Sequence, residues 1–124
     1  METQDCKRAQ RAYERVISRV DFENSDKYKS FALSFPALIH SVGLAQAIAY
    51  AQAKSLPEYQ ADLAYVVGME TMDVLAKESR LAHLSEYRRL TFEVINCASW
   101  IKRYVEAFFK KKDNQESPNG EPSV

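Results

Sequence analysis

The 124-residue chain is poor in the residues that break helices. Only 3 glycines and 4 prolines occur, and Pro118 and Pro122 lie in the final segment NQESPNGEPSV, whose composition predicts a disordered tail over residues 113–124. Residues 1–112 show no alternating strand pattern with hairpin turns, whereas helical spacing of apolar residues recurs throughout. The sequence therefore predicts one all-α domain over residues 1–112.

Residues that build catalytic or metal centres are also scarce. Cys6 and Cys97 lie far apart without CxxC spacing, so we expect free thiols in a reducing compartment. The chain has only two histidines, and no HExxH motif or glycine-rich phosphate loop occurs. One histidine, His40, lies in an apolar stretch and is expected to be a core or interface residue. These absences predict no enzyme activity, no cofactor and no metal.

The chain carries no net charge, because 17 Lys and Arg residues balance 17 Asp and Glu residues. Any electrostatic function must therefore come from local segregation of charge. The opening residues are charged and lack the apolar core of a signal peptide, which predicts a cytoplasmic protein. The longest uncharged run, residues 30–53, is rich in alanine and interrupted by Pro36, so it predicts a buried helix rather than a membrane span.

Apolar spacing predicts a compact bundle of about five to six helices. The expected helices cover Thr3–Phe22, Asp26–Ser34, Pro36–Lys54, Pro57–Lys77, a short stretch over Arg80–Leu84, and Glu86–Lys112. Pro36 is expected to begin the third helix, because its missing N–H costs nothing in a first turn. That helix has apolar residues on most sides and is expected at the centre of the bundle. Gly68, inside the fourth helix, is expected where another backbone approaches closely.

Basic residues are segregated on the first helix. The expected core stripe of this helix consists of Ala9, Ala12, Tyr13, Val16, Ile17 and Val20. On a helical wheel, the sector roughly opposite holds Arg8, Arg11, Arg15 and Arg19. Arginine forks match phosphate geometry, and a row spaced by about one turn, ~5.4 Å, can follow a nucleic-acid backbone. The alternative is a solvated face whose charge is balanced by nearby acidic residues such as Glu14.

The last helix shows a related pattern, with cations and an aromatic ring on the side away from its apolar stripe: Arg88, Phe92, Arg103 and Lys110. An aromatic residue among cations is typical of a surface on which RNA bases stack. Lys27 and Lys29 flank Tyr28 in a similar way.

Five segments resemble the small subunit of the type III-B CRISPR effector, the Cmr complex. They are Tyr28-Lys29-Ser30-Phe31-Ala32, Ser34-Phe35-Pro36-Ala37-Leu38-Ile39, Gly43-Leu44-Ala45-Gln46-Ala47, Tyr87-Arg88-Arg89-Leu90-Thr91 and Trp100-Ile101-Lys102-Arg103-Tyr104. The resemblance implies a small all-α subunit without nuclease activity, several copies of which stack beside the backbone subunits. Together such copies line the channel that holds guide and target RNA.

The resemblance and the charge pattern together predict a non-catalytic subunit of an RNA-guided antiviral effector. Its expected partners are other Cmr subunits, copies of itself, guide RNA and target RNA, with no membrane. The candidate RNA-binding residues are Arg8, Arg11, Arg15, Arg19, Lys27, Lys29, Arg88, Arg89, Lys102 and Arg103. Replacing Arg11, Arg15 and Arg19 with Glu is expected to leave the fold intact and to weaken RNA binding. A helical adaptor whose basic faces meet acidic proteins remains the alternative.

Overall fold

A computed structural model of the protein describes the backbone of residues 3–116 and the side chains of residues 3–109. Within that range it contains six α-helices and no strand, which confirms the all-α prediction. The helices are α1 (Gln4–Ile17), α2 (Ser25–Val42), α3 (Leu44–Lys54), α4 (Pro57–Val67), α5 (Met72–Leu81) and α6 (Leu84–Glu116). Because residues 84–117 contain no glycine or proline, α6 continues through residues 113–116, the beginning of the predicted tail. The rest of that tail lies outside the described residues.

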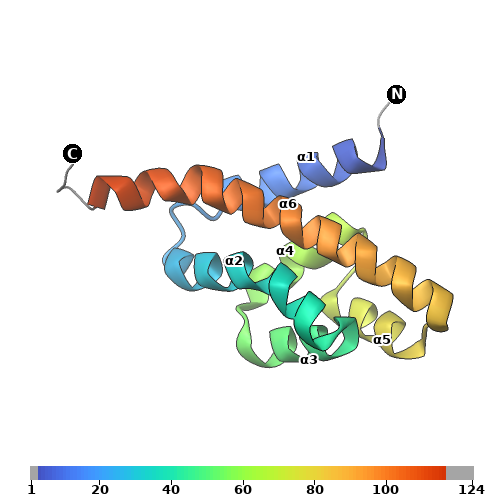
Figure 1. The fold of residues 1–124 in the computed structure, drawn as a ribbon. Coiled ribbons are helices and arrows are strands. Elements are labelled where there is room, and N and C mark those ends of the chain that lie inside the picture. The colour runs from blue at the N-terminus through green and yellow to red at the C-terminus, as the bar shows by residue number, and fades with distance from the viewer. Residues whose placement is uncertain (1–2, 117–124) are drawn as a thin grey trace.

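The long helix α6 is the element on which the others assemble. It crosses the whole molecule and packs against α1, α2 and α4 (Figure 1). Its fully buried side chains include Val94, Ile101 and Val105, so its apolar stripe runs through most of its length. The prediction that the third helix is central is therefore wrong, because α3 lies at one edge and packs against α2, α4 and α5.

The helix break predicted before Pro36 lies instead at Gly43. Pro36 is buried inside α2, which runs uninterrupted to Val42 although a proline lacks the N–H that would bond to the preceding turn. Gly43 ends α2 with φ +89° and ψ 161°, a backbone conformation that is essentially restricted to glycine. The first turn of α3 follows at once, and the N–H of Ala45 donates to the Tyr87 hydroxyl of α6 at 3.0 Å.

The predicted fourth helix is two helices separated at Gly68. This glycine has φ +98° in the left-handed region, and its N–H donates to the Ala64 carbonyl oxygen at 2.9 Å. The N–H of Met69 donates to the same oxygen at 2.9 Å, as in a glycine C-cap. No backbone lies within contact distance of the position of an added Cβ, where the nearest atom is Arg11 Nη1 at 3.5 Å, so the expected close backbone approach is wrong. Thr71 then caps α5 by accepting the Val74 N–H at 3.2 Å.

The remaining helix ends differ from prediction at three places. Thr3 caps α1 by accepting the N–H of Cys6 at 3.1 Å. The helix ends at Ile17 instead of Phe22, and turns follow over residues 18–21 and 23–24. The second helix begins at Ser25 instead of Asp26. The stretch predicted over Arg80–Leu84 is divided between the end of α5 and the beginning of α6.

An aromatic cluster joins α2 to α4 in the core. Tyr28, Phe35 and Tyr59 are fully buried, and Tyr59 meets the other two rings edge to face, with ring centroids 5.6 Å from Tyr28 and 5.8 Å from Phe35. Edge-to-face contacts of this kind are a favoured aromatic geometry.

No helix in the described part of the chain has both the length and the apolar content required to cross a bilayer. His40, expected in the core or at an interface, is exposed.

Candidate nucleic-acid interface

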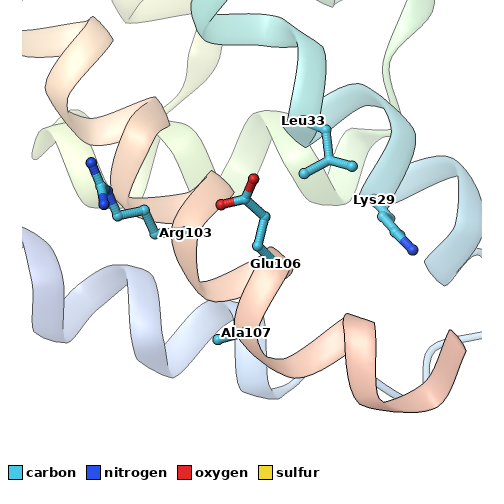
Figure 2. A pocket seen from close by; sticks show the side chains of 5 residues that line it. All are labelled: Lys29, Leu33, Arg103, Glu106 and Ala107. Carbon is cyan, nitrogen blue, oxygen red and sulfur yellow. The ribbon is translucent and has the colours of Figure 1, made fainter. Parts of the chain in front are cut away.

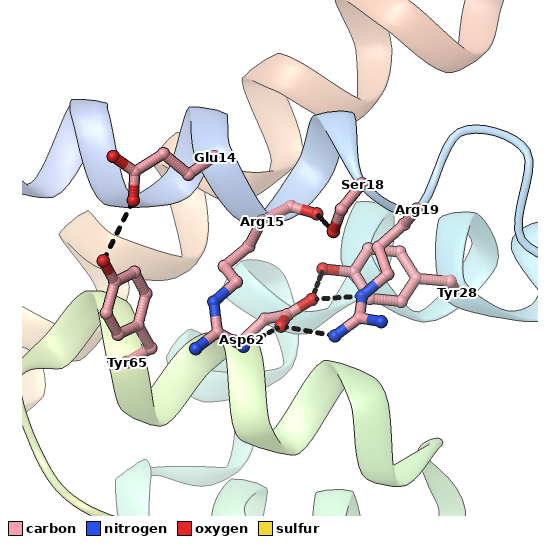
Figure 3. Close-up of polar contacts among 7 residues, drawn as sticks. All are labelled: Glu14, Arg15, Ser18, Arg19, Tyr28, Asp62 and Tyr65. Atoms are coloured by element: carbon pink, nitrogen blue, oxygen red, sulfur yellow. Dashed lines mark hydrogen bonds and ion pairs between the residues drawn. The ribbon is translucent and has the colours of Figure 1, made fainter.

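Arg15 of α1 and Arg19 of the turn that follows α1 bind a buried carboxylate on α4 (Figure 3). Arg19 forms a two-pronged contact with Asp62, with Nε 2.9 Å from Oδ2 and Nη2 2.8 Å from Oδ1. Arg15 donates to Oδ1 at 3.0 Å, and the Tyr28 hydroxyl donates to Oδ2 at 2.6 Å. Because Asp62 is fully buried, these donors replace the water that its carboxylate would otherwise bind. The cluster joins α1, α2 and α4.

The solvent-facing sector predicted for the four arginines is therefore wrong. The buried residues of α1 are Ala12 and Val16, whereas Tyr13 and Ile17, assigned to the core stripe, are 39% and 41% exposed. The buried face is thus rotated toward the arginines, and Arg15 lies over α4. A glutamate at that position would place a second carboxylate beside Asp62, so the triple glutamate replacement is not expected to leave the fold intact.

The remaining two arginines of the row, both on α1, also contact neighbouring helices. Arg8 reaches α6, where Nη1 donates to Asn96 Oδ1 at 3.4 Å and Nη2 lies 3.9 Å from Glu93 Oε1. Its side chain is only 11% exposed. The guanidinium of Arg11 lies 5.8 Å from the centre of the Tyr65 ring on α4, within the range of a cation–π contact. The arginine row thus fastens α1 to α4 and α6.

The turn around Tyr28 does not present an aromatic ring between two cations. Tyr28 is fully buried, and this burial together with the neighbouring Asp62 carboxylate raises the pKa of its hydroxyl well above the ordinary value. The phenol therefore stays protonated as a donor to Asp62 and cannot stack on a base. Lys27 is exposed, while Lys29 is partly buried and lies toward α6.

A groove between α2 and α6 is lined by two of the predicted cations, and a neighbouring hollow is lined by a third. Figure 2 shows its lining residues, which come from α2 and α6 and enclose about 770 Å³: Lys29, Leu33, Arg103, Glu106 and Ala107. A neighbouring hollow of about 240 Å³ is lined by Pro36, Ser99, Lys102, Arg103 and Glu106. Lys29, Lys102 and Arg103 thus share one surface with a single carboxylate, Glu106, among the lining residues. Each of the two hollows is lined by two predicted RNA-binding residues, and they have Arg103 in common.

The remaining candidates lie near the other end of α6. Arg88 and Arg89 are exposed, and Arg89 Nη1 lies 2.6 Å from Glu93 Oε2. Phe92 is 69% exposed, which confirms that an aromatic side chain faces solvent beside these arginines. Arg89 precedes Arg103 by about 21 Å along the helix axis, so these residues form a separate surface.

Sequence reasoning missed Asp62, although the sequence contains a signal for it. Tyr59, Asp62, Leu63 and Val66 follow helical spacing, and all four are buried. A carboxylate in an apolar stripe predicts a buried charge that requires basic or hydroxyl partners. Within the part of the chain that the structure describes, no group of three or more histidine, cysteine, aspartate or glutamate residues is arranged to hold a metal ion.

Comparison with known proteins assigns the family. The sequence profile of the family described as CRISPR-associated protein (Cas_Cmr5) matches residues 4–108. The chain belongs to the Cmr5 family. The CRISPR system Cmr subunit Cmr5 of Thermus thermophilus is 37% identical over 106 residues, which cover 83% of this chain and 93% of that protein. The X-ray crystal structure of a CRISPR-associated Cmr5 family protein from Thermus thermophilus matches with a TM-score of 0.84 and 36% identity, over 87% of this chain and 98% of the other.

These matches confirm the resemblance to the small Cmr subunit that the sequence segments indicated. The Cmr5 match spans every candidate RNA-binding residue, from Arg8 to Arg103, and the α2–α6 groove as well. The groove is therefore part of the family domain and not of an added segment.

Proposed function

We propose that this chain is a non-catalytic small subunit of a type III-B Cmr effector complex in the cytoplasm. Copies of it would stack beside the backbone subunits and help to hold guide and target RNA during antiviral defence. Membership of the Cmr5 family supports the assembly, and the relative from Thermus thermophilus is itself named a Cmr subunit. The observation that carries the RNA contact is the gathering of Lys29, Lys102 and Arg103 on the α2–α6 surface.

The chemistry of that surface suits a phosphate backbone. Arg103 is exposed and offers a planar fork that can bind a phosphate with two hydrogen bonds. Lys29 and Lys102, which line the same two hollows as Arg103, add charge on flexible stems. Phosphate contacts position RNA without reading its sequence, so specificity would stay with base pairing to the guide.

The candidate residues fall into two classes by their surroundings. We assign RNA contact to the exposed or groove-lining cations Lys27, Lys29, Arg88, Arg89, Lys102 and Arg103. We assign Arg8, Arg15 and Arg19 to holding α1, because their side chains are only 11% to 35% exposed and their guanidinium groups contact carboxylates or an amide of other helices. Arg89 also contacts a carboxylate, Glu93 of its own helix, but its side chain is 64% exposed. Arg11, over the Tyr65 ring, belongs with the second class.

A neutralising triple variant in the reconstituted complex tests the proposal. The combined variant with Lys29→Gln, Lys102→Gln and Arg103→Gln should weaken target-RNA binding. The slope of log affinity against log salt concentration should become less negative by about 0.7 for each single-strand phosphate that the variant no longer neutralises. A matched control replaces Lys54, Lys77 and Arg80, three exposed cations of α3 and α5, with glutamine and should bind RNA as the wild type does.

Assembly is measured on the same samples by co-purification with the other subunits. The proposal requires that the groove variant still assembles. Unchanged RNA affinity and salt slope in that variant would contradict the RNA contact. Loss of assembly with unchanged RNA binding would favour the adaptor function.

A further inference from the structure

A second hollow lies between α1 and α6, beside Trp100. It encloses about 460 Å³, within the roughly 300–1,000 Å³ typical of small-molecule pockets. Its lining residues are Asp5, Asn96, Ser99, Trp100 and Arg103. We propose that this hollow binds one nucleotide of single-stranded RNA, with the base stacked on the Trp100 indole and the phosphate on Arg103. The proposal rests on the RNA-holding function proposed above and adds a base contact to it.

One face of the Trp100 ring is already covered by an aromatic ladder. Tyr104 stacks on it with ring centroids 5.8 Å apart and planes inclined by 24°, and Phe108 stacks on Tyr104 at 6.2 Å and 23°. Residues four apart lie one above the other on a helix, so the ladder runs along α6 toward its C-terminus. Asn96, one helical turn before Trp100 and so on the side away from Tyr104, lines the same hollow as the indole. A base entering the hollow would extend the ladder by one ring.

The indole is held in place before any ligand arrives. Its Nε1 donates to Asp5 Oδ1 at 3.3 Å, a contact that joins α6 to the first turn of α1. Tyr13 supports the ladder from α1, with its ring edge-on to Tyr104 and Phe108 at centroid distances of 5.7 Å each. A ring that is already ordered loses little conformational freedom on binding, which favours a stacking contact.

The polar lining fits a nucleotide better than a simple ion. Asn96 Oδ1 accepts from Arg8, so the amide nitrogen of Asn96 is the group left to donate to a base edge. The Ser99 hydroxyl can donate or accept, and the Asp5 carboxylate can accept from an exocyclic amino group. Among the lining residues Asp5 is the single carboxylate and Arg103 the single cation, so neither a bare anion nor a bare metal ion has a matching set of partners.

Arg103 connects this hollow to the α2–α6 groove. The same side chain lines the groove, the small hollow beside Lys102, and the hollow beside Trp100. A strand whose phosphates follow Lys29 and Lys102 would therefore pass Arg103 at the point where a base could turn toward Trp100. Stacking on an aromatic ring is tolerant of sequence, so this contact would not interfere with guide-directed specificity.

The intrinsic fluorescence of the full chain tests the proposal, because Trp100 is its single tryptophan. A short single-stranded oligoribonucleotide should quench this fluorescence, whereas an abasic ribose-phosphate strand of equal length should bind with a similar salt dependence and leave the fluorescence unchanged. Anisotropy of labelled RNA then measures affinity for variants. Trp100→Leu should weaken binding by about 5- to 150-fold, the range expected for one stacked base, and Trp100→Phe should recover most of the loss. Tyr50→Leu, at a 48% exposed aromatic of α3, a helix that carries none of the assigned RNA-binding residues, should bind as the wild type does.

Three results are possible, and each decides the question. Quenching by the oligoribonucleotide alone, with the Trp100→Leu loss, supports the nucleotide site. Salt-dependent binding of both strands, without quenching and without an effect of Trp100→Leu, overturns the site and leaves the phosphate contacts of the proposed function intact. Absence of binding by either strand at low salt overturns the site together with RNA contact by the isolated chain.

Discussion

Replacement of Asp62 by alanine should destabilise the bundle more than any surface substitution. The change removes the acceptor of the fully buried Tyr28 hydroxyl, and an orphaned buried donor costs about 1–3 kcal/mol. It also leaves Arg19, whose side chain is 20% exposed, without its two-pronged partner. Arg15 is 35% exposed, so water can solvate its guanidinium and the lost contact with Asp62 costs little. Together these effects give about 3 kcal/mol, the lower end of the range for breaking a buried ion pair.

Urea unfolding followed by far-ultraviolet circular dichroism measures this effect. A loss of about 3 kcal/mol should also lower the Tm by roughly 10 to 15 °C for a chain of this length. Asp62→Asn, which retains a carbonyl acceptor for Tyr28, should fall between the wild type and Asp62→Ala. Glu78→Ala, at an exposed position of α5, serves as the control and should stay within about 0.5 kcal/mol of the wild type. An Asp62→Ala variant as stable as that control would refute the structural role of the cluster.

Further predictions concern the two interhelical glycines and the two thiols. Gly43→Asn should cost about 1–3 kcal/mol because its backbone conformation is essentially restricted to glycine, whereas Gly68→Asn should cost less because asparagine tolerates the left-handed region. Equal Tm values for the two variants would contradict this difference. Burial raises the pKa of the Cys97 thiol to about 12, so at pH 8 it remains protonated and a thiol reagent should label exposed Cys6 first. Both thiols should react in urea, and equally fast labelling of both in the native chain would contradict the burial of Cys97.

The helical content of this chain could be predicted from sequence, but the positions of its breaks could not be predicted equally well. The break between α2 and α3, for example, could lie at Pro36 or at Gly43. Phe35 before Pro36 is disfavoured in helical geometry, so the sequence favours a break there. In the structure both residues are buried in the core, and α2 continues to Gly43, where the chain turns into α3. Tertiary packing overrides the local preference at Pro36.

The arginine row shows why the candidate site was harder to predict than the fold. A helical wheel places residues around an axis but does not say which neighbouring helix covers the margin of the apolar stripe. Asp62 lies on α4, distant in sequence from Arg15 and Arg19, and this long-range pairing decides that the row faces protein. The α2–α6 groove depends on the same kind of information, because Lys29 and Arg103 come together only when two distant helices pack.

Covalent crosslinking between target RNA and this subunit, within the reconstituted Cmr complex, tests the central claim most directly. Target RNA carrying photoreactive nucleotides is irradiated, and the crosslinked peptides are located by mass spectrometry. RNA contact along the α2–α6 surface predicts crosslinks in the segments around Lys29 and over residues 99–107. Crosslinks confined to α3 and α5, or their absence from this subunit in a complex that binds its target, would contradict it.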